Sequence, residues 1–448
     1  MNNNFFLQLV QLVALTTDCH QTRKEYQMKG KTIATVLALV LLVSSVLVGC
    51  NAPSSTTPPG ETQEYPGVEL LTNLVGEENL SVLNLIGFKA AEKAMDDLPF
   101  NRGDSNVLAL SDAGYPVIEV GSGFPDTYYT TEGAIDGISA TSGCTLGRGN
   151  LILVHRSIYD PLWFAFFDKK TGECVYFEVD ENTLKTYLED EAAGIVDYAA
   201  FIHLPAETLF SRISKANIKP AALMQAVNAE AWHHNFTEEV FGGNEFSILT
   251  ISAVWDKGMS YEFVKAAELH NHICPGLTSG YFIAQYLDEN FPLEGKDECY
   301  IVWAVPPWCK DDAFQAIFDA TVGKRHMAVM YIPKDIQEQI YPEYQNIAGI
   351  FVKFNEATGE AQAIVLGWDW GKAQSDCGIS GADFRDFSTY KWWWARLRSD
   401  VLLMEHEPEE YVSTLKVVDL GNQGSVKKMM AKWMAVGSNP LVELGIMP

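Results

Sequence analysis

An internal repeat constrains the fold of this chain more than any other feature of its sequence. Two stretches, from about 69 to 190 and from about 261 to 370, share four landmarks in the same order. Each has a helix-like stretch around a glycine-aromatic pair, a strand-like apolar run, a helix-like segment entering a glycine turn, and a hairpin. Two unrelated α+β domains with common turn chemistry would be the alternative, but the shared order favours duplication. We therefore expect an α+β fold of two tandem related units packed as a pseudo-dimer.

Each landmark of the repeat can be assigned to particular residues in both copies. Alternating apolar residues around an Asp/Asn-x-x-Thr-Gly turn predict the two hairpins. The paired landmarks are Gly87-Phe88 and Gly280-Tyr281, the runs 106–110 and 300–304, the turns 144–148 and 320–324, and the hairpins around 168–172 and 355–359. A helical linker is expected over 191–260 and a helical extension over 371–448. Apolar residues make up 47% of the chain, which is enough for a large core.

The N-terminal segment resembles an export signal. A short basic start at Met28 precedes seventeen mostly apolar residues and then Leu47-Val48-Gly49-Cys50, the pattern of a lipoprotein signal peptide. An uncleaved membrane helix would need about 20 residues. We expect residues 1–27 to be an upstream extension, 28–50 the signal peptide, Cys50 the lipidated residue, and 51–68 a disordered, proline-rich tether. The predicted location is the extracytoplasmic face of a bacterial cell membrane.

The net charge of the chain limits the classes of partner that it is expected to bind. Lys and Arg number 32 against 58 Asp and Glu, a net charge of −26. Loss of residues 1–49 removes four basic and two acidic residues and leaves −28. A surface so acidic repels phosphate backbones, so nucleic acid is not an expected partner. It suits the handling of cations, and it equally suits plain solubility.

One short segment carries the clearest candidate chemistry. His270, His272 and Cys274 stand at alternate positions, and in an extended segment alternate side chains point the same way. Pro275 suits the first position of a helix, which would place Cys274 at a helix N-terminus that favours a thiolate. Three ligands with an open fourth position are typical of a reactive metal site. The alternative is a set of buried side chains near a helix start.

Residues further along could complete this site. Cys309 could be a fourth ligand, a mobile ligand, or the disulfide partner of Cys274. Asp312 and Gln315 lie three residues apart on a helix-like segment, so they share a face and could orient imidazole ligands. An N-terminal capping pair is an equally good interpretation of these two residues.

The run His270-Asn271-His272-Ile273-Cys274-Pro275-Gly276, followed by Gly280-Tyr281, resembles the HxHxCPG…GY signature of the FmdE-like family, named for a gene in the formylmethanofuran dehydrogenase operon. The stretch 309–324 resembles its second signature, a Cys followed by Asp-Ala-x-Gln and a Gly-Cys-Thr-x-Gly-Lys-Gly-Asn turn. The resemblance covers about 261–370, with a weaker copy over 69–190. It implies an α+β core, often paired as a homodimer, and a Cys/His metal site.

The two copies depart from the family pattern in opposite ways. The second keeps the metal motif but has residues 319–326 in place of the glycine-rich turn, with Thr321 and Lys324 as candidate ligand-binding residues. The first keeps the turn, Gly143 to Asn150 with Cys144, but has Glu77, Asn79, Ser81 and Gly133 at the positions that match the ligands. No CxxC pair follows the second copy, so the zinc finger of many relatives should be absent. One working site is expected, with the Cys144 turn of the first copy either as a scaffold or reaching across the interface between the copies.

The leading expectation is thus an exported, membrane-anchored protein that binds a divalent transition metal, zinc first, with nickel or iron as alternatives. It would bind the ion or a small metal-bearing ligand, or pass metal to a membrane transporter. A metal- or thiol-dependent enzyme, with Cys274 as the candidate thiolate, is the second class. A redox module that cycles a Cys274–Cys309 disulfide and a scaffold with a structural metal are the others.

Overall fold

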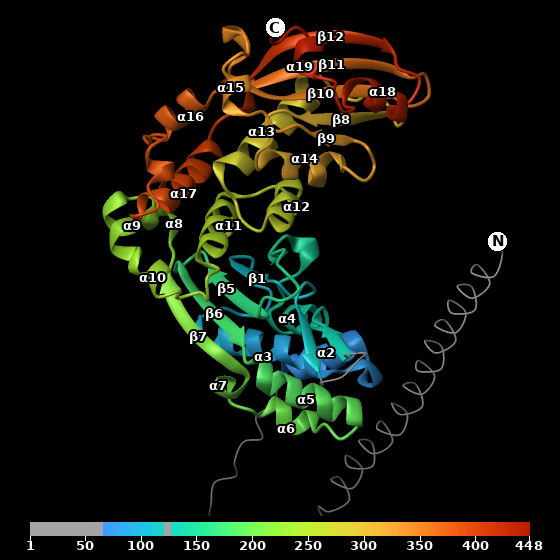
Figure 1. Cartoon of the computed structure of the whole chain (residues 1–448). Coiled ribbons are helices and arrows are strands. Elements are labelled where there is room, and N and C mark those ends of the chain that lie inside the picture. The colour runs from blue at the N-terminus through green and yellow to red at the C-terminus, as the bar shows by residue number, and fades with distance from the viewer. Residues whose placement is uncertain (1–65, 121–126) are drawn as a thin grey trace, which may run out of the picture. The chain divides into compact units, whose positions relative to one another are not determined.

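The computed structural model describes residues 66–120 and 127–448 (Figure 1). The predicted signal peptide, Cys50 and most of the tether lie outside this part of the chain. Helix α2 begins at Pro66, inside the last residues assigned to the tether. Within the described ranges, every helix is too short or too polar to cross a bilayer.

Helices and strands occur in runs along the chain, as is typical of an α+β fold. The α-helices are α2 (Pro66–Val75), α3 (Val82–Asp97), α4 (Gly133–Ser142), α5 (Glu181–Ala193), α6 (Tyr198–Ile202), α7 (Ala206–Leu209), α8 (Pro220–Leu223), α9 (Ala226–Trp232), α10 (His234–Thr237), α11 (Glu245–Lys257), α12 (Tyr261–His270), α13 (Pro275–Asn290), α14 (Lys310–Phe318), α15 (Lys334–Gln337), α16 (Trp370–Asp376), α17 (Lys391–Leu403), α18 (Val426–Trp433) and α19 (Pro440–Glu443). The strands are β1 (Val107–Ser111), β2 (Val117–Val120), β3 (Thr127–Thr130), β4 (Leu151–Leu153), β5 (Trp163–Asp168), β6 (Glu173–Val179), β7 (Phe210–Asn217), β8 (Glu298–Ala304), β9 (Met327–Val329), β10 (Ile347–Asn355), β11 (Glu360–Trp368) and β12 (Val412–Asn422).

Two five-stranded sheets share one topology. The strand order is β4-β1-β5-β6-β7 in the first sheet and β9-β8-β10-β11-β12 in the second. In each, one parallel pair, β1 with β4 or β8 with β9, adjoins an antiparallel hairpin, β5–β6 or β10–β11. The four predicted landmarks fall on equivalent elements of the two copies. The duplication expected from the sequence is therefore present in the strand order itself.

The glycine-aromatic pair has the same packing role in both copies. A Cβ on Gly87 of α3 would lie 2.0 Å from the carbonyl oxygen of Ala134 in α4, and one on Gly280 of α13 would lie 2.5 Å from that of Lys310 in α14. Real Cβ atoms do not approach so closely, so glycine is what permits these two helix crossings. This close approach explains why the sequence repeats a glycine at this landmark.

The linker and the extension are largely helical, but each also contributes an edge strand. Strand β7 lies beside β6, and β12 pairs antiparallel with β11. Their residues are mostly exposed or half-buried, so neither strand shows a clean apolar alternation. The sheets supply their partners, and the sequence pattern alone gave no signal for them.

The chain divides into two compact parts by its own contacts, and these cut across the repeats. Among the described residues, one holds 66–103, 117–120, 127–143 and 179–211, which include α2 to α7 and the antiparallel pair β2–β3. The other holds 104–116, 144–178 and 212–448, which include the second sheet and most of the first. In the first part, α3 packs on α4, and the Asn84 side chain donates to the carbonyl oxygen of Gly133 at 2.9 Å.

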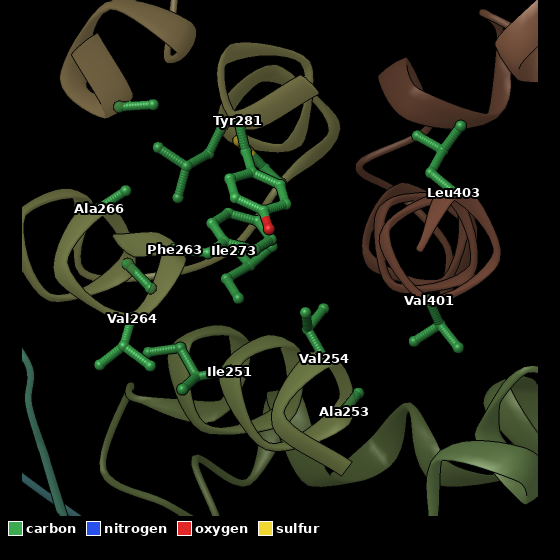
Figure 2. Packing of buried hydrophobic residues seen from close by; sticks show 14 of the residues in the cluster. Ile251, Ala253, Val254, Phe263, Val264, Ala266, Ile273, Tyr281, Val401 and Leu403 are labelled. Carbon is green, nitrogen blue, oxygen red and sulfur yellow. The ribbon is translucent and has the colours of Figure 1, made fainter. Parts of the chain in front are cut away.

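The second sheet separates two apolar clusters within the larger part. Tyr300 and Val302 of β8 face a cluster built with α11 to α14 and α17, whereas Ile301 and Trp303 face α18 and α19. This alternation is the two-residue period of a strand buried on both faces. Figure 2 shows the first cluster, in which Phe263 of α12 stacks on Tyr281 of α13 with ring centroids 4.5 Å apart. The packed ends of α12, α13 and α14 fix the position of the candidate site.

Candidate metal centre

The motif lies in a tight connection between two helices. Ser260 caps α12 by accepting from the Phe263 N–H, and the helix ends at His270. Asn271 then adopts a left-handed conformation, φ 62°, which Asn tolerates better than most residues. Cys274 is the residue before α13, with Pro275 at the first helical position as expected. The predicted extended segment is therefore wrong, because a helix end and a left-handed turn occupy these positions.

Three helix ends converge on one group of soft donors. His270 ends α12, Cys274 precedes α13 and Cys309 precedes α14, and their ligand atoms lie within 4.8 Å of one another. The Cys274 sulfur lies 3.7 Å from His270 Nε2. Cys274 is buried, whereas His270 and Cys309 are half-buried. The cluster is thus anchored in the core and reaches the surface on one side.

Gly276 allows Cys309 to sit this close to α13. A Cβ at this position would lie 2.8 Å from Cys309 Cβ and 3.2 Å from its sulfur. The loop before α14 is held by Trp308, whose indole N–H donates to Ser279 Oγ at 3.2 Å, and by the buried Lys310, which donates to the carbonyl oxygen of Pro306 at 3.0 Å. The glycine of the Cys-Pro-Gly motif is therefore part of the geometry of the site.

Asp312 and Gln315 form a chain of hydrogen bonds that ends at His270 Nδ1. One oxygen of Asp312 lies 2.7 Å from His270 Nδ1, and the Gln315 amide donates to the other at 3.0 Å. Nδ1 is thereby held by a carboxylate, which leaves Nε2 directed at the cysteines. Burial lowers the pKa of His270, but Asp312 and Cys309 outweigh burial and raise it to about 9.

The pKa values of the two cysteines of this cluster shift in opposite directions, and the lowered one is that of Cys309 rather than that of Cys274, the candidate thiolate of the sequence analysis. The hydrogen bond from the Cys274 thiol, together with His270, holds the pKa of Cys309 well below its usual range. The same hydrogen bond and burial raise the pKa of Cys274. Both sulfurs are free thiols in this structure. A helix N-terminus favours a thiolate at either cysteine, but the hydrogen bond with Cys309, followed by burial, raises the pKa of Cys274.

His272 stands beside the cluster rather than in it. Its ring centroid lies 4.4 Å from that of His270 and 5.0 Å from that of Phe246, and its Nδ1 faces Asn271 Oδ1 at 2.9 Å. Burial and the charge of His270 lower its pKa to about 3. The left-handed Asn271 turns the chain so that alternate side chains no longer share a direction. His272 was predicted as a ligand, and the structure does not bring it into the group.

The remaining predicted residues lie elsewhere. Cys144 is buried, with its sulfur 3.7 Å from the carbonyl oxygen of Val107. Lys324 forms an exposed ion pair with Asp319, and Thr321 accepts at its carbonyl from the His326 N–H at 3.1 Å. None of these three belongs to the His270 cluster among the residues that the structure describes. The glycine-rich turn that contains Cys144 borders a separate cavity of about 430 Å³, which is lined by Arg148, Lys169, Trp255 and Tyr261 among others.

The sequence interpretation missed two charged residues of α17. Asp400 is fully buried and accepts from Thr278 Oγ1 at 2.7 Å, which ties α17 to α13. The half-buried Arg396 interacts electrostatically with both cysteines and with Asp400. Their spacing of four residues within a helix, shortly after three consecutive tryptophans, was the available signal. Arg396 adds positive charge near the Cys309 thiolate.

Two thiols and one imidazole suit a borderline metal such as zinc. Thiolate and imidazole are its preferred ligands, and three protein ligands leave a position for water or a small ligand. Asp312 supplies the carboxylate that commonly supports a metal-bound imidazole. The residues present therefore fit a divalent transition metal held by His270, Cys274 and Cys309.

The chain was compared with known proteins and families. The family model described as "FmdE, Molybdenum formylmethanofuran dehydrogenase operon" matches residues 80–200 and 269–376. The two matches fall on the two copies of the repeat, and the second contains the whole cluster. No curated protein matches the chain.

Proposed function

The chain belongs to the FmdE family, and we propose that it binds a divalent transition metal, zinc above all, at His270, Cys274 and Cys309. From the signal-like pattern that ends at Cys50 we further propose that the protein is exported and lipid-anchored. The observation that carries the proposal is the convergence of these three donors within 4.8 Å, with the imidazole already oriented by Asp312 at 2.7 Å. A preoriented, partly exposed site suits an ion with an exchangeable fourth ligand.

The ligand at the fourth coordination position of the metal would define what the protein binds or transfers. A water, a small anion or a metal-bearing cofactor could complete the coordination, and the acidic chain, net −26, attracts cations toward it. Membrane anchoring through Cys50 would hold the site close to a transporter that receives the metal or the ligand. These partners are part of the proposal.

Metal analysis of the purified full chain tests the proposal. We expect about one equivalent of metal at this site, and its loss in His270→Ala, Cys274→Ser and Cys309→Ser. His272→Ala is the matched control, because it removes a neighbouring imidazole that lies outside the group. Retention of all metal by the three ligand variants would contradict the proposal.

One observation favours a second candidate, a thiol-dependent enzyme or redox module. Cys309 is half-buried and its pKa is held low beside His270, a pairing found in nucleophilic cysteines. In a redox cycle the Cys309 thiolate and the Cys274 thiol would form a disulfide and give up two electrons and the Cys274 proton, while an acceptor disulfide takes up the two electrons and is cleaved to a thiol and a thiolate. Rapid alkylation of Cys309 at neutral pH in the zinc-loaded chain would favour this reading, whereas protection by zinc favours metal binding.

A further inference from the structure

A second group of metal-type donors lies at the second sheet, apart from the centre described above. Cys299 of β8, His326 just before β9 and Glu356 just after β10 place a sulfur, an imidazole nitrogen and a carboxylate oxygen within 4.8 Å of one another. The cysteine and histidine are half-buried, and the glutamate is exposed. A solvated ion could therefore reach the group.

The backbone fixes these positions. Cys299 pairs with Phe354 across the β8–β10 ladder, two residues before Glu356. The Glu356 N–H donates to the carbonyl oxygen of Asp297 at 2.7 Å, and the Val302 N–H donates to that of His326 at 2.8 Å. All three residues are thus carried by hydrogen-bonded strand ends rather than by a loose loop, which favours a preorganised site.

The repeat shows what stands at the equivalent place in the first copy. There the Ala109 N–H donates to the carbonyl oxygen of Asn150 at 2.9 Å, as the Val302 N–H does to that of His326. The Asn150 amide closes the glycine-rich turn, since it accepts from the Thr145 N–H at 3.0 Å and donates to the carbonyl oxygen of Val107 at 3.1 Å. His326 thus occupies the place of the residue that closes this turn.

An imidazole cannot accept and donate in this way with the geometry of an amide. In the second copy a ring nitrogen of His326 instead lies within 4.8 Å of the Cys299 sulfur and of a Glu356 carboxylate oxygen. The changed turn of the second copy is better explained as a gained set of donors than as simple decay.

We propose that Cys299, His326 and Glu356 form a second binding site for a divalent transition metal of the zinc class. Sulfur, imidazole and carboxylate are all zinc ligands, with bonds of about 2.0–2.3 Å, which rotation of the exposed glutamate side chain would help to reach. The site goes beyond the proposed function and does not depend on it, because the two groups share no residue.

The test is a zinc titration of the chelator-stripped full chain under reducing conditions, with bound zinc counted at saturation. We expect about two equivalents for the wild type, one for Cys299→Ser/His326→Ala, and one for Cys274→Ser/Cys309→Ser. Glu356→Gln should weaken the second site by about tenfold or more, since it removes a charged ligand. Glu360→Gln, on the same hairpin but paired with Asn422 at 3.3 Å, should bind zinc as the wild type does.

The outcomes separate the two sites. If Cys299→Ser/His326→Ala binds as much zinc as the wild type, with the same affinities, the second site is refuted. Retention of one equivalent by this variant also shows that it is folded and that its first site is intact. If instead Cys274→Ser/Cys309→Ser keeps both equivalents, the proposed function fails at the first centre while the second site stands.

Discussion

At the scale of single residues, the centre depends on how Asp312 controls His270. In the metal-free chain the imidazole has a pKa of about 9, so it carries a proton at neutral pH. A metal that binds Nε2 must release that proton. Protonation of His270 and of Cys274 therefore competes with metal, and the competition weakens as the pH rises.

We predict that the apparent zinc affinity rises by at least about tenfold per pH unit from neutral pH to about 9. Asp312→Asn should end the histidine part of this rise at a lower pH, because the neutral amide no longer stabilises the imidazolium. Competition against a chromophoric chelator across this range measures both profiles. An unchanged profile in the variant would show that Asp312 does not set the protonation of His270.

The Cys-Pro-Gly glycine supports a second prediction at this scale. Gly276→Ala should leave the helix intact, because Ala is the better helix former, but its methyl group would press on Cys309. Overpacking of about 1–3 kcal/mol corresponds to a loss of about 5- to 150-fold in zinc affinity if it falls on the bound state. Gly295→Ala, where a Cβ meets no atom within 4 Å, is the control. Equal affinity in both variants would count against the close contact.

At the scale of elements, the site is held by the convergence of helix ends rather than by one motif. Helices α12, α13 and α14 each supply one donor. Helix α17 lies behind them and is tied to α13 through Asp400 and Thr278. Burial raises the pKa of Asp400, and its Oδ2 has no hydrogen-bond partner within the described part of the chain. The Thr278 hydroxyl is thus its single side-chain donor there.

Removal of that donor should destabilise the helix pair. Thr278→Val keeps the shape but leaves the Asp400 carboxyl without its 2.7 Å partner, at a cost of about 1–3 kcal/mol. Urea unfolding of the metal-free protein measures the change in free energy of unfolding. Asp400→Asn, which retains an acceptor for the threonine, should cost less than Thr278→Val; the reverse order would argue that the carboxyl group itself is the stabilising feature.

At the scale of the whole molecule, the repeat determines which copy carries the metal centre. The N-terminal segment would determine on which side of the membrane that centre lies. Two copies of one strand order give the chain two places for each motif, and within the described ranges the grouped Cys/His donors lie in the second copy. The N-terminal 65 residues precede the part of the chain that the structure describes. Export and anchoring through them place the centre outside the cytoplasm in our proposal.

Mass spectrometry of the protein from its native membranes tests this proposal. We predict a mature chain that begins at a lipidated Cys50, because the signal-peptide pattern ends at this residue. Two or three acyl chains would give a durable anchor. Cys50→Ser should shift the protein from the membrane fraction to the soluble or precursor form. An intact Met1, or a Cys50→Ser variant with unchanged processing and membrane association, would refute lipidation.

The sequence by itself determined the duplication, the hairpins, the helix start at Pro275 and three of the donors, because turn residues, alternation and ligand types are local properties. It did not determine which donors meet. After the left-handed Asn271 the ring of His272 lies beside the group rather than in it, and the close approach at Gly276 brings in Cys309. The hydrogen bond between the two sulfurs raises the pKa of Cys274 and lowers that of Cys309. These are contacts between segments far apart in the chain, and the environment that sets distance and protonation exists only once the helices pack.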